Sequence, residues 1–146
     1  MKIDGKCQCG DITYEAEADP NQSIICNCTD CQTLAGSAFR WMVVVPETDF
    51  KLLTGKLKTF NKPNESGEPL PSLFCPNCGS PIYSIYNRGG VRFFNVRVPT
   101  ARQHADLPPK RQYWKRSAQK WLTGVNQIEG SETEGVYLPT ANPESR

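Results

Sequence analysis

Regular alternation of apolar and polar residues marks the first strands that the chain predicts. Residues 11–18 (DITYEAEA) place an apolar side chain at every second position, which is the period of a strand with one buried face. Residues 23–26 (SIIC) predict a second short strand, and residues 39–45 (FRWMVVV) predict a third that ends at Pro46. The first third of the chain is therefore expected to be rich in β-structure.

The middle of the chain predicts further strands. Residues 49–55 (DFKLLTG) and 57–60 (LKTF) are typical of a hairpin-like pair around Gly55, and residues 61–72 (NKPNESGEPLPS) of a polar loop. Residues 81–98 (PIYSIYNRGGVRFFNVRV) predict a hairpin whose turn is the RGG sequence. These segments extend the expected β-structure across most of the chain.

Helical signals are short. Residues 29–37 (TDCQTLAGS) predict about two helical turns, with Thr29 or Asp30 as the N-cap and Gly36 as the stop. Residues 117–122 (SAQKWL) predict one more helical turn, and residues 129–146, which begin with EGSETEG, are expected to be extended or mobile. The sum predicts a mainly β fold, in which short antiparallel strands form a sandwich or small barrel.

Length and composition fit one globular domain. The 146 residues include twelve prolines and eleven glycines, which indicate many turns. The first residues (MKIDGKCQCGD) lack the apolar segment of a signal peptide, and no run of about 18 apolar residues predicts a membrane span. A cytoplasmic, reducing location without a membrane partner is therefore expected.

Charge gives little indication of a nucleic-acid partner. The formal net charge is +2, and the basic residues are scattered except in residues 108–116 (PPKRQYWKR). Basic residues interleaved with Tyr113 and Trp114 are one way to bind a single nucleic-acid strand. A solvated surface segment whose two aromatic side chains turn inward is the preferred interpretation, and no nucleic-acid partner is expected.

Cysteines carry the chemistry of this sequence. Seven cysteines form three clusters, Cys7-x-Cys9, Cys26-x-Cys28-x-x-Cys31 and Cys75-x-x-Cys78. An odd number cannot all form disulfides, and a thioredoxin-like redox pair needs a βαβ setting that this pattern lacks. A buried cysteine that acts as a small apolar residue does not explain clusters beside glycine and proline. Metal binding is the favoured interpretation.

The spacings suit zinc held by thiolates. A tetrahedral zinc ion holds its sulfur ligands about 4 Å apart, which is less than the spacing of residues i and i+2 along a straight strand. Each Cys-x-Cys segment must therefore bend, and Gly10 would ease such a bend. Residues 75–79 (CPNCG) are typical of a metal-binding turn, in which Gly79 can adopt a positive φ. One histidine, His104, is too few for the common His-rich sites, and an iron–sulfur cluster is the minor alternative.

Seven ligands divide naturally into four and three. A closed structural site would join Cys7 and Cys9 to Cys75 and Cys78, and a site of Cys26, Cys28 and Cys31 would leave one position for water or substrate. A ribbon-like alternative would combine the C-x-x-C pairs Cys28/Cys31 and Cys75/Cys78 instead. Spacing alone leaves both divisions open.

Four motifs carry a family resemblance. They are residues 5–20 (GKCQCGDITYEAEADP), 26–46 (CNCTDCQTLAGSAFRWMVVVP), 74–90 (FCPNCGSPIYSIYNRGG) and 113–121 (YWKRSAQKW). In this order they resemble the glutathione-dependent formaldehyde-activating enzyme family, which includes centromere protein V domains and has an Mss4-like β fold. The resemblance covers about residues 2–125 and implies one zinc domain there, which leaves residues 126–146 as a C-terminal tail.

The resemblance also implies site roles and an activity. It assigns a structural zinc to Cys7, Cys9, Cys75 and Cys78, and a catalytic zinc to Cys26, Cys28 and Cys31, hence two zinc ions per chain. The implied activity is that of a carbon–sulfur lyase, which adds glutathione to formaldehyde and gives S-(hydroxymethyl)glutathione. A three-thiolate zinc suits this role because it is a weak Lewis acid that can hold an incoming thiol as a nucleophilic thiolate.

Neighbouring residues allow a second interpretation. Ser37 and Arg40 could orient a substrate. The preferred interpretation is that Ser37 caps a turn and that Arg40 is a solvated strand residue. His104 is expected to be exposed. Asp30, His104 or a neighbouring chain could supply a fourth ligand to the site of Cys26, Cys28 and Cys31. That arrangement would favour a non-catalytic zinc module, which interacts with partners or carries a thiol or metal. The other arginines of the later strands, Arg88, Arg92 and Arg97, are taken as surface charges.

Overall fold

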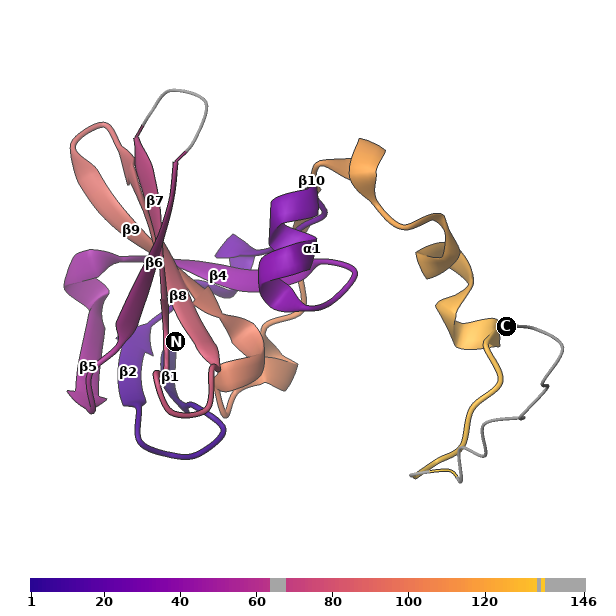
Figure 1. Cartoon of the computed structure of the whole chain (residues 1–146), viewed down its shortest axis with the longest axis horizontal. Helices are drawn as coiled ribbons and strands as arrows, with labels where there is room; N and C mark the ends of the chain where they lie inside the picture. The colour runs from indigo at the N-terminus through magenta and orange to yellow at the C-terminus, as the bar shows by residue number, and fades with distance from the viewer. Residues whose placement is uncertain (64–67, 134, 136–146) are drawn as a thin grey trace, which may run out of the picture.

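Two β-sheets, a short α-helix and several 3-10 turns make up the part of the chain that the structure describes (Figure 1). The computed structural model describes residues 1–63, 68–133 and 135. The strands are β1 (Lys2–Lys6), β2 (Thr13–Glu17), β3 (Ser23–Cys26), β4 (Arg40–Pro46), β5 (Phe50–Thr54), β6 (Lys58–Pro63), β7 (Pro69–Phe74), β8 (Pro81–Arg88), β9 (Val91–Arg97) and β10 (Arg111–Tyr113). The helix is α1 (Thr29–Ala35), and the 3-10 turns are η1 (Pro20–Gln22), η2 (Glu47–Asp49), η3 (Val98–Thr100), η4 (His104–Asp106), η5 (Lys115–Ser117) and η6 (Lys120–Gln127).

Strand order divides the strands into a small and a large sheet. The small sheet has the order β1-β2-β5, and the large sheet has the order β10-β3-β4-β9-β8-β7-β6. Neighbouring strands are antiparallel throughout, except that β10 runs parallel to β3. The expected mainly β fold is confirmed, with this one parallel pair as a departure from the antiparallel pattern.

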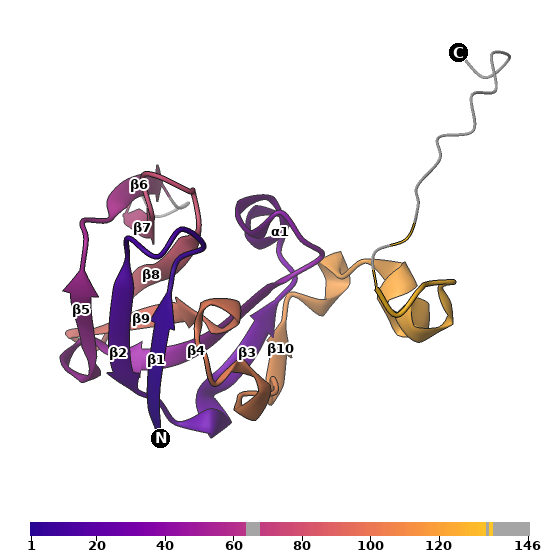
Figure 2. The ribbon, with the colours of Figure 1, turned by 90° about the horizontal axis from the view of Figure 1, so that it is seen from below.

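The core lies between the two sheets. Figure 2 shows β1, β2 and β5 crossing over strands of the large sheet. Phe50 of β5 is the central contact, because its ring lies 5.2 Å from the ring of Tyr14 and 4.9 Å from that of Tyr83. Tyr83 in turn stacks on Phe94 at 4.2 Å. Aromatic rings at such distances join the sheets into one sandwich.

Alternation along the chain correctly predicted several elements. In β2, Tyr14 and Ala16 are buried while Thr13, Glu15 and Glu17 are not. The RGG hairpin is also confirmed, since β8 and β9 pair antiparallel across this turn. Both turn glycines have positive φ, 57° and 79°, which suits the right-handed twist of a two-residue hairpin.

The predicted hairpin around Gly55 is wrong. Strand β5 pairs with β2 in the small sheet, whereas β6 pairs with β7 in the large sheet. Gly55, with φ of 78°, is the crossing point between the sheets, and a Cβ there would lie 2.5 Å from Cδ1 of Ile12. The aromatic ring of Phe50 packs into the core from the small sheet, which explains why β5 joins β2.

The predicted polar loop at residues 61–72 is also wrong over most of its length. Strands β6 and β7 continue into it and pair as far as Pro63 opposite Pro69. The part of the loop at residues 64–67 lies outside the described residues. Proline is tolerated here because the pairing of β7 with β8 begins only at Ser72, so the first residues of β7 need no N–H donors toward β8.

The C-terminal segment departs from the sheets as a series of 3-10 turns (Figure 1). Tyr113 and Trp114 are 47% and 52% exposed, so the expectation that these aromatics turn inward is wrong. The Arg116 guanidinium lies 4.8 Å from the Trp114 ring, a cation–π contact at the surface. Most of the tail expected at residues 126–146 lies outside the described residues, and no helix in the described part is long and apolar enough to cross a membrane.

Candidate metal centres

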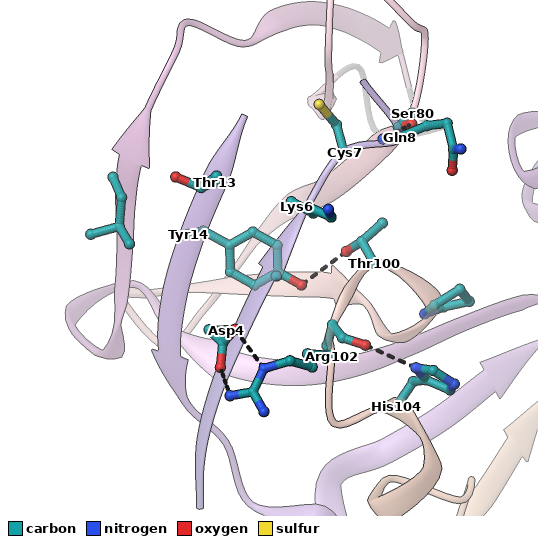
Figure 3. A pocket seen from close by; sticks show the side chains of 14 residues that line it. Asp4, Lys6, Cys7, Gln8, Thr13, Tyr14, Ser80, Thr100, Arg102 and His104 are labelled. Atoms are coloured by element: carbon teal, nitrogen blue, oxygen red, sulfur yellow. Dashed lines mark hydrogen bonds and ion pairs between the residues drawn. The ribbon is translucent and has the colours of Figure 1, made fainter. Parts of the chain in front are cut away.

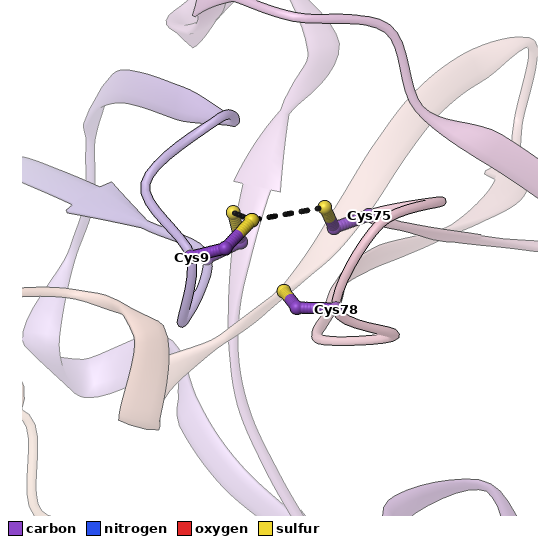
Figure 4. Close-up of side chains that lie close together, drawn as sticks. Cys9, Cys75 and Cys78 are labelled. Carbon is purple, nitrogen blue, oxygen red and sulfur yellow. Dashed lines mark hydrogen bonds between the residues drawn. The ribbon is translucent and has the colours of Figure 1, made fainter.

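Four cysteines from the two sheets converge in a first cluster (Figure 4). This quartet consists of Cys7, Cys9, Cys75 and Cys78, whose sulfur atoms all lie within 4.8 Å of one another. The Sγ–Sγ distance is 3.5 Å between Cys7 and Cys9, and 3.7 Å between Cys9 and Cys75. A tetrahedral zinc ion with Zn–S bonds of about 2.3 Å would hold its sulfurs about 3.8 Å apart. The quartet therefore fits a four-coordinate zinc.

Turns at the strand ends place these sulfurs. Cys7 follows β1, and Gly10 takes a φ of 88° that bends the chain back toward β2. Cys75 follows β7 in a turn closed by a hydrogen bond of 2.9 Å from the Gly79 N–H to the Cys75 carbonyl, with Gly79 at φ of 76°. Gly79 thus adopts the positive φ that the sequence predicted, and Gly10 lies at the expected bend.

Hydrogen bonds to sulfur favour the thiolate form at two of the four cysteines, Cys7 and Cys78. The Ile12 N–H donates to the Cys7 Sγ at 3.3 Å. Contact with the Ser80 hydroxyl, 3.2 Å away, lowers the pKa of Cys78 to about 5. Cys7 and Cys75 are buried, whereas Cys9 and Cys78 lie at the surface. A metal here would join β1 of the small sheet to β7 of the large sheet.

A second cluster, the trio, consists of Cys26, Cys28 and Cys31, whose sulfurs also lie within 4.8 Å of one another. Cys26 ends β3, and Cys31 lies in the first turn of α1. The N-cap of α1 is Cys28, whose Sγ accepts a hydrogen bond of 3.3 Å from the Cys31 N–H, so neither Thr29 nor Asp30 has the predicted capping role. Gly36 ends the helix in the left-handed region, as predicted.

The thiols of the trio depend on one another electrostatically. A hydrogen bond from Cys31 lowers the pKa of Cys26, and the same contact raises the pKa of Cys31. Burial raises the pKa of Cys28. Three such thiols do not all ionise by themselves near neutral pH, whereas a divalent cation stabilises three thiolates together. The donor set therefore fits a soft divalent metal such as zinc.

Arg40 donates two hydrogen bonds to the trio. Its Nη2 and Nε lie 2.7 Å and 3.2 Å from the Cys31 Sγ. The preferred expectation, a solvated strand residue, is wrong, because β4 pairs with β3 and brings Arg40 directly opposite Cys26. Ser37 is exposed, and its N–H donates to the Gln32 carbonyl at 3.3 Å after the helix end, as expected for a turn cap.

Within the described residues, no histidine, cysteine or carboxylate joins the trio as a fourth ligand. Asp30 forms an ion pair with Lys62. His104 is exposed, as expected, and its ring Nδ1 lies 3.0 Å from the Ala101 carbonyl oxygen at another pocket (Figure 3). The ribbon-like alternative is also wrong, since Cys28 and Cys31 do not group with Cys75 and Cys78.

A small cavity of about 140 Å³ opens beside the trio. Its polar lining includes Cys28, Arg40, Ser72, Ser84 and Asn95. Strand register explains this lining, because Asn95, Ser84 and Ser72 lie opposite one another on β9, β8 and β7. Residues opposite one another across a sheet project from the same face, so these polar side chains share the face that carries Arg40.

The pocket in Figure 3 lies beside the quartet instead. It measures about 750 Å³ and contains the buried Tyr14, whose hydroxyl lies 2.9 Å from Oγ1 of Thr100. Burial raises the pKa of Tyr14 to about 12. Hydrogen bonds from Arg102 and Gln103 lower the pKa of Asp4 to about 2. The polar groups of this pocket thus bond mainly to one another.

Arg97 was missed by the sequence reasoning. It was taken as a surface charge, yet only 5% of the residue is exposed. Burial, together with the nearby Arg40 charge, lowers its pKa to about 9, so it remains cationic at neutral pH. Alternation along β9 predicts which face a residue occupies, but not that other parts of the chain bury Arg97 on that face. Arg88 and Arg92, in contrast, are exposed as expected.

Comparisons with known proteins agree with this architecture. The family model described as glutathione-dependent formaldehyde-activating enzyme matches residues 2–117. A crystal structure of a Rhodobacter sphaeroides protein from a structural genomics project shares the fold, with a TM-score of 0.59 and 19% sequence identity. That similarity covers 77% of this chain and 99% of the Rhodobacter chain. No curated protein matches the sequence.

Proposed function

The chain belongs to the glutathione-dependent formaldehyde-activating enzyme family, and we propose that it is a zinc-dependent carbon–sulfur lyase. The proposed reaction joins a thiol, such as glutathione, to formaldehyde or a related aldehyde. The observation that carries this proposal is the trio, three close thiols beside a cavity and without a fourth ligand from the described residues. A three-ligand site with an open position is typical of catalytic zinc, whereas a closed four-ligand site is typical of structural zinc.

The two clusters take different roles in this proposal. The quartet holds a structural zinc that joins the sheets, and the trio holds a catalytic one. When bound at the trio, zinc supplies a position at which a substrate thiol is held as its thiolate. Arg40 positions the trio, because its two hydrogen bonds fix the Cys31 sulfur and its positive charge offsets the negative charge of the thiolates.

The reaction needs no redox partner. The thiol loses its proton to solvent water, its sulfur forms a new bond to the carbonyl carbon, and the carbonyl π bond breaks. The carbonyl oxygen then takes a proton from water, and the product is a hydroxymethyl thioether or its homologue. The reverse sequence breaks the carbon–sulfur bond. The chain's contribution is to orient the thiol beside Cys28 and Arg40 in the small polar cavity.

A second candidate function is a non-catalytic zinc module that binds a partner. The exposed aromatic and aliphatic residues of the C-terminal segment support it, since Trp114 and Trp121 are each 52% exposed and Ile128 is 60% exposed. This candidate requires that these side chains form one contiguous apolar surface, which is typical of interaction sites. This candidate predicts that the zinc-loaded chain does not accelerate thiol addition.

Exchange spectroscopy by NMR separates the two candidates. It measures the rate at which formaldehyde and glutathione interconvert with their adduct at equilibrium, and so includes the uncatalysed background. The lyase proposal predicts faster exchange with the wild-type chain, and background exchange with Cys28→Ser at equal folded concentration. Wild-type exchange at the background rate for several thiols would contradict the lyase and favour the module.

A further inference from the structure

Arg97 is a buried cation whose hydrogen-bonding capacity is mostly unused. Its Nη1 donates to the Asn95 carbonyl at 2.9 Å, and no other hydrogen bond or ion pair joins this guanidinium to the described residues. The Nε atom is fully buried and has no acceptor among them. Burial of an N–H donor without an acceptor is unfavourable, and this cost falls on the Arg97 Nε–H. An acceptor that enters from outside would relieve this cost.

Strand register places Arg97 near the trio. On β4, Arg40 lies opposite Cys26 of β3, and Met42 lies opposite Arg97 of β9. Arg40 and Arg97 are therefore diagonal neighbours on one face of the large sheet, about 7–8 Å apart. Arg40 donates to Cys31. Arg97 is a second cation on this face, and it still has an unpaired N–H donor.

Two adjoining cavities lie between Arg97 and the trio. Arg97 lines a cavity of about 340 Å³, whose other walls are largely apolar and include Phe60 and Phe74. Leu34 and Ser72 line both this cavity and the smaller one beside Cys28, so the two adjoin. A ligand that holds its sulfur at the trio can therefore extend along apolar walls to the Arg97 guanidinium.

We propose that Arg97 determines substrate specificity by binding the carboxylate of a short mercaptocarboxylic acid, whose sulfur occupies the trio. This inference rests on the proposed function for the sulfur end of the ligand. The chain between the two groups must be short, because Arg97 is only a diagonal strand neighbour, about 7–8 Å away, of the Arg40 that donates to Cys31. The carboxylate stays unchanged while the sulfur adds to the aldehyde, so the reaction balance given above still holds.

A thiol-free probe tests the Arg97 end by itself. Butanoate carries the carboxylate and a short apolar chain, and butanamide is its uncharged counterpart. Titrated into the zinc-loaded full chain, butanoate should shift the Arg97 Nε–H resonance saturably, whereas butanamide should not. The resonance is identified by its loss in Arg97→Lys. No shift with butanoate, or equal shifts with both probes, would overturn the proposal.

Variants then test specificity. Arg97→Gln should weaken butanoate binding about tenfold or more, because a charge-assisted hydrogen bond is lost, and Arg97→Lys should retain part of the affinity. Arg92→Gln is the matched control, since Arg92 lies on the same strand, faces the other side and pairs with Glu47 at 2.8 Å. Equal binding by Arg97→Gln and Arg92→Gln, with melting temperatures near wild type, would contradict the assignment.

Failure of this inference can be distinguished from failure of the proposed function. If butanoate binds at Arg97 but thiol addition proceeds at the background rate, the lyase proposal is wrong and the carboxylate site stands. If the chain accelerates addition of 3-mercaptopropanoate and 1-propanethiol equally, and butanoate does not bind, the lyase stands and the Arg97 assignment is wrong.

Discussion

Arg40 is expected to control how tightly the trio retains its metal. Its guanidinium donates to the Cys31 Sγ from Nη2 at 2.7 Å and from Nε at 3.2 Å. A hydrogen bond to a charged group contributes about 1.5–3 kcal/mol, and loss of a residue that supports a metal ligand typically lowers metal affinity about 10- to 100-fold. Arg40→Gln removes the positive charge and both donors to Cys31 while keeping a polar side chain. We expect it to weaken zinc binding at the trio by about 10- to 100-fold.

Competition with a chelator measures this effect. Zinc release from the wild-type chain should occur in two phases, and the phase missing in Cys28→Ser identifies the trio. In Arg40→Gln, only this phase should move to lower chelator concentration, while Arg40→Lys should lie between the variant and the wild type. Arg92→Gln, an exposed arginine paired with Glu47, serves as the charge-matched control. Unchanged release in Arg40→Gln would refute the reasoning.

Three further predictions concern the fold. Gly5→Ala should lower the free energy of unfolding by about 1–3 kcal/mol in a denaturant titration, because the new Cβ would lie 2.3 Å from atoms of the buried Tyr14 ring. Phe50→Ala should cost about 3 kcal/mol in the same titration, whereas alanine at the 49% exposed Phe60 should cost less than about 1 kcal/mol. The pKa of Asp4 is lowered from 3.8 to about 2, so its ionised form stabilises the fold above pH 3.8 and this contribution disappears as pH falls through 2. The melting temperature of Asp4→Asn should therefore lie below that of wild type at pH 7, with the gap closing between pH 4 and pH 2; a constant gap would contradict this linkage.

Local signals in the sequence were sufficient for most individual strands and for the metal-binding turns. The alternation around Tyr14 predicted β2, and the glycines after Arg88 predicted the hairpin turn because only positive φ closes it. Gly10 and Gly79 were likewise predicted from the bends that clustered cysteines need. These features depend on a few adjacent residues, which the sequence displays directly.

Features that depend on distant pairing were missed. The chain leaves the small sheet at Gly55, and no local pattern showed that β5 pairs with β2 and not with β6. The hydrogen bonds from Arg40 to Cys31 follow from β3–β4 register and from the position of α1, neither of which spacing fixes. Burial of Arg97 has the same origin, because other elements of the chain cover the face on which it lies.

The division of the cysteines into two metal sites with different roles is the central claim, and metal content tests it most directly. Zinc per chain should be measured for the wild type, for Cys28→Ser in the trio and for Cys75→Ser in the quartet. The account predicts that zinc falls from two per chain to one in a folded Cys28→Ser, and that Cys75→Ser loses its zinc and unfolds. One zinc in the wild type, or unfolding of Cys28→Ser with loss of all zinc, would contradict it.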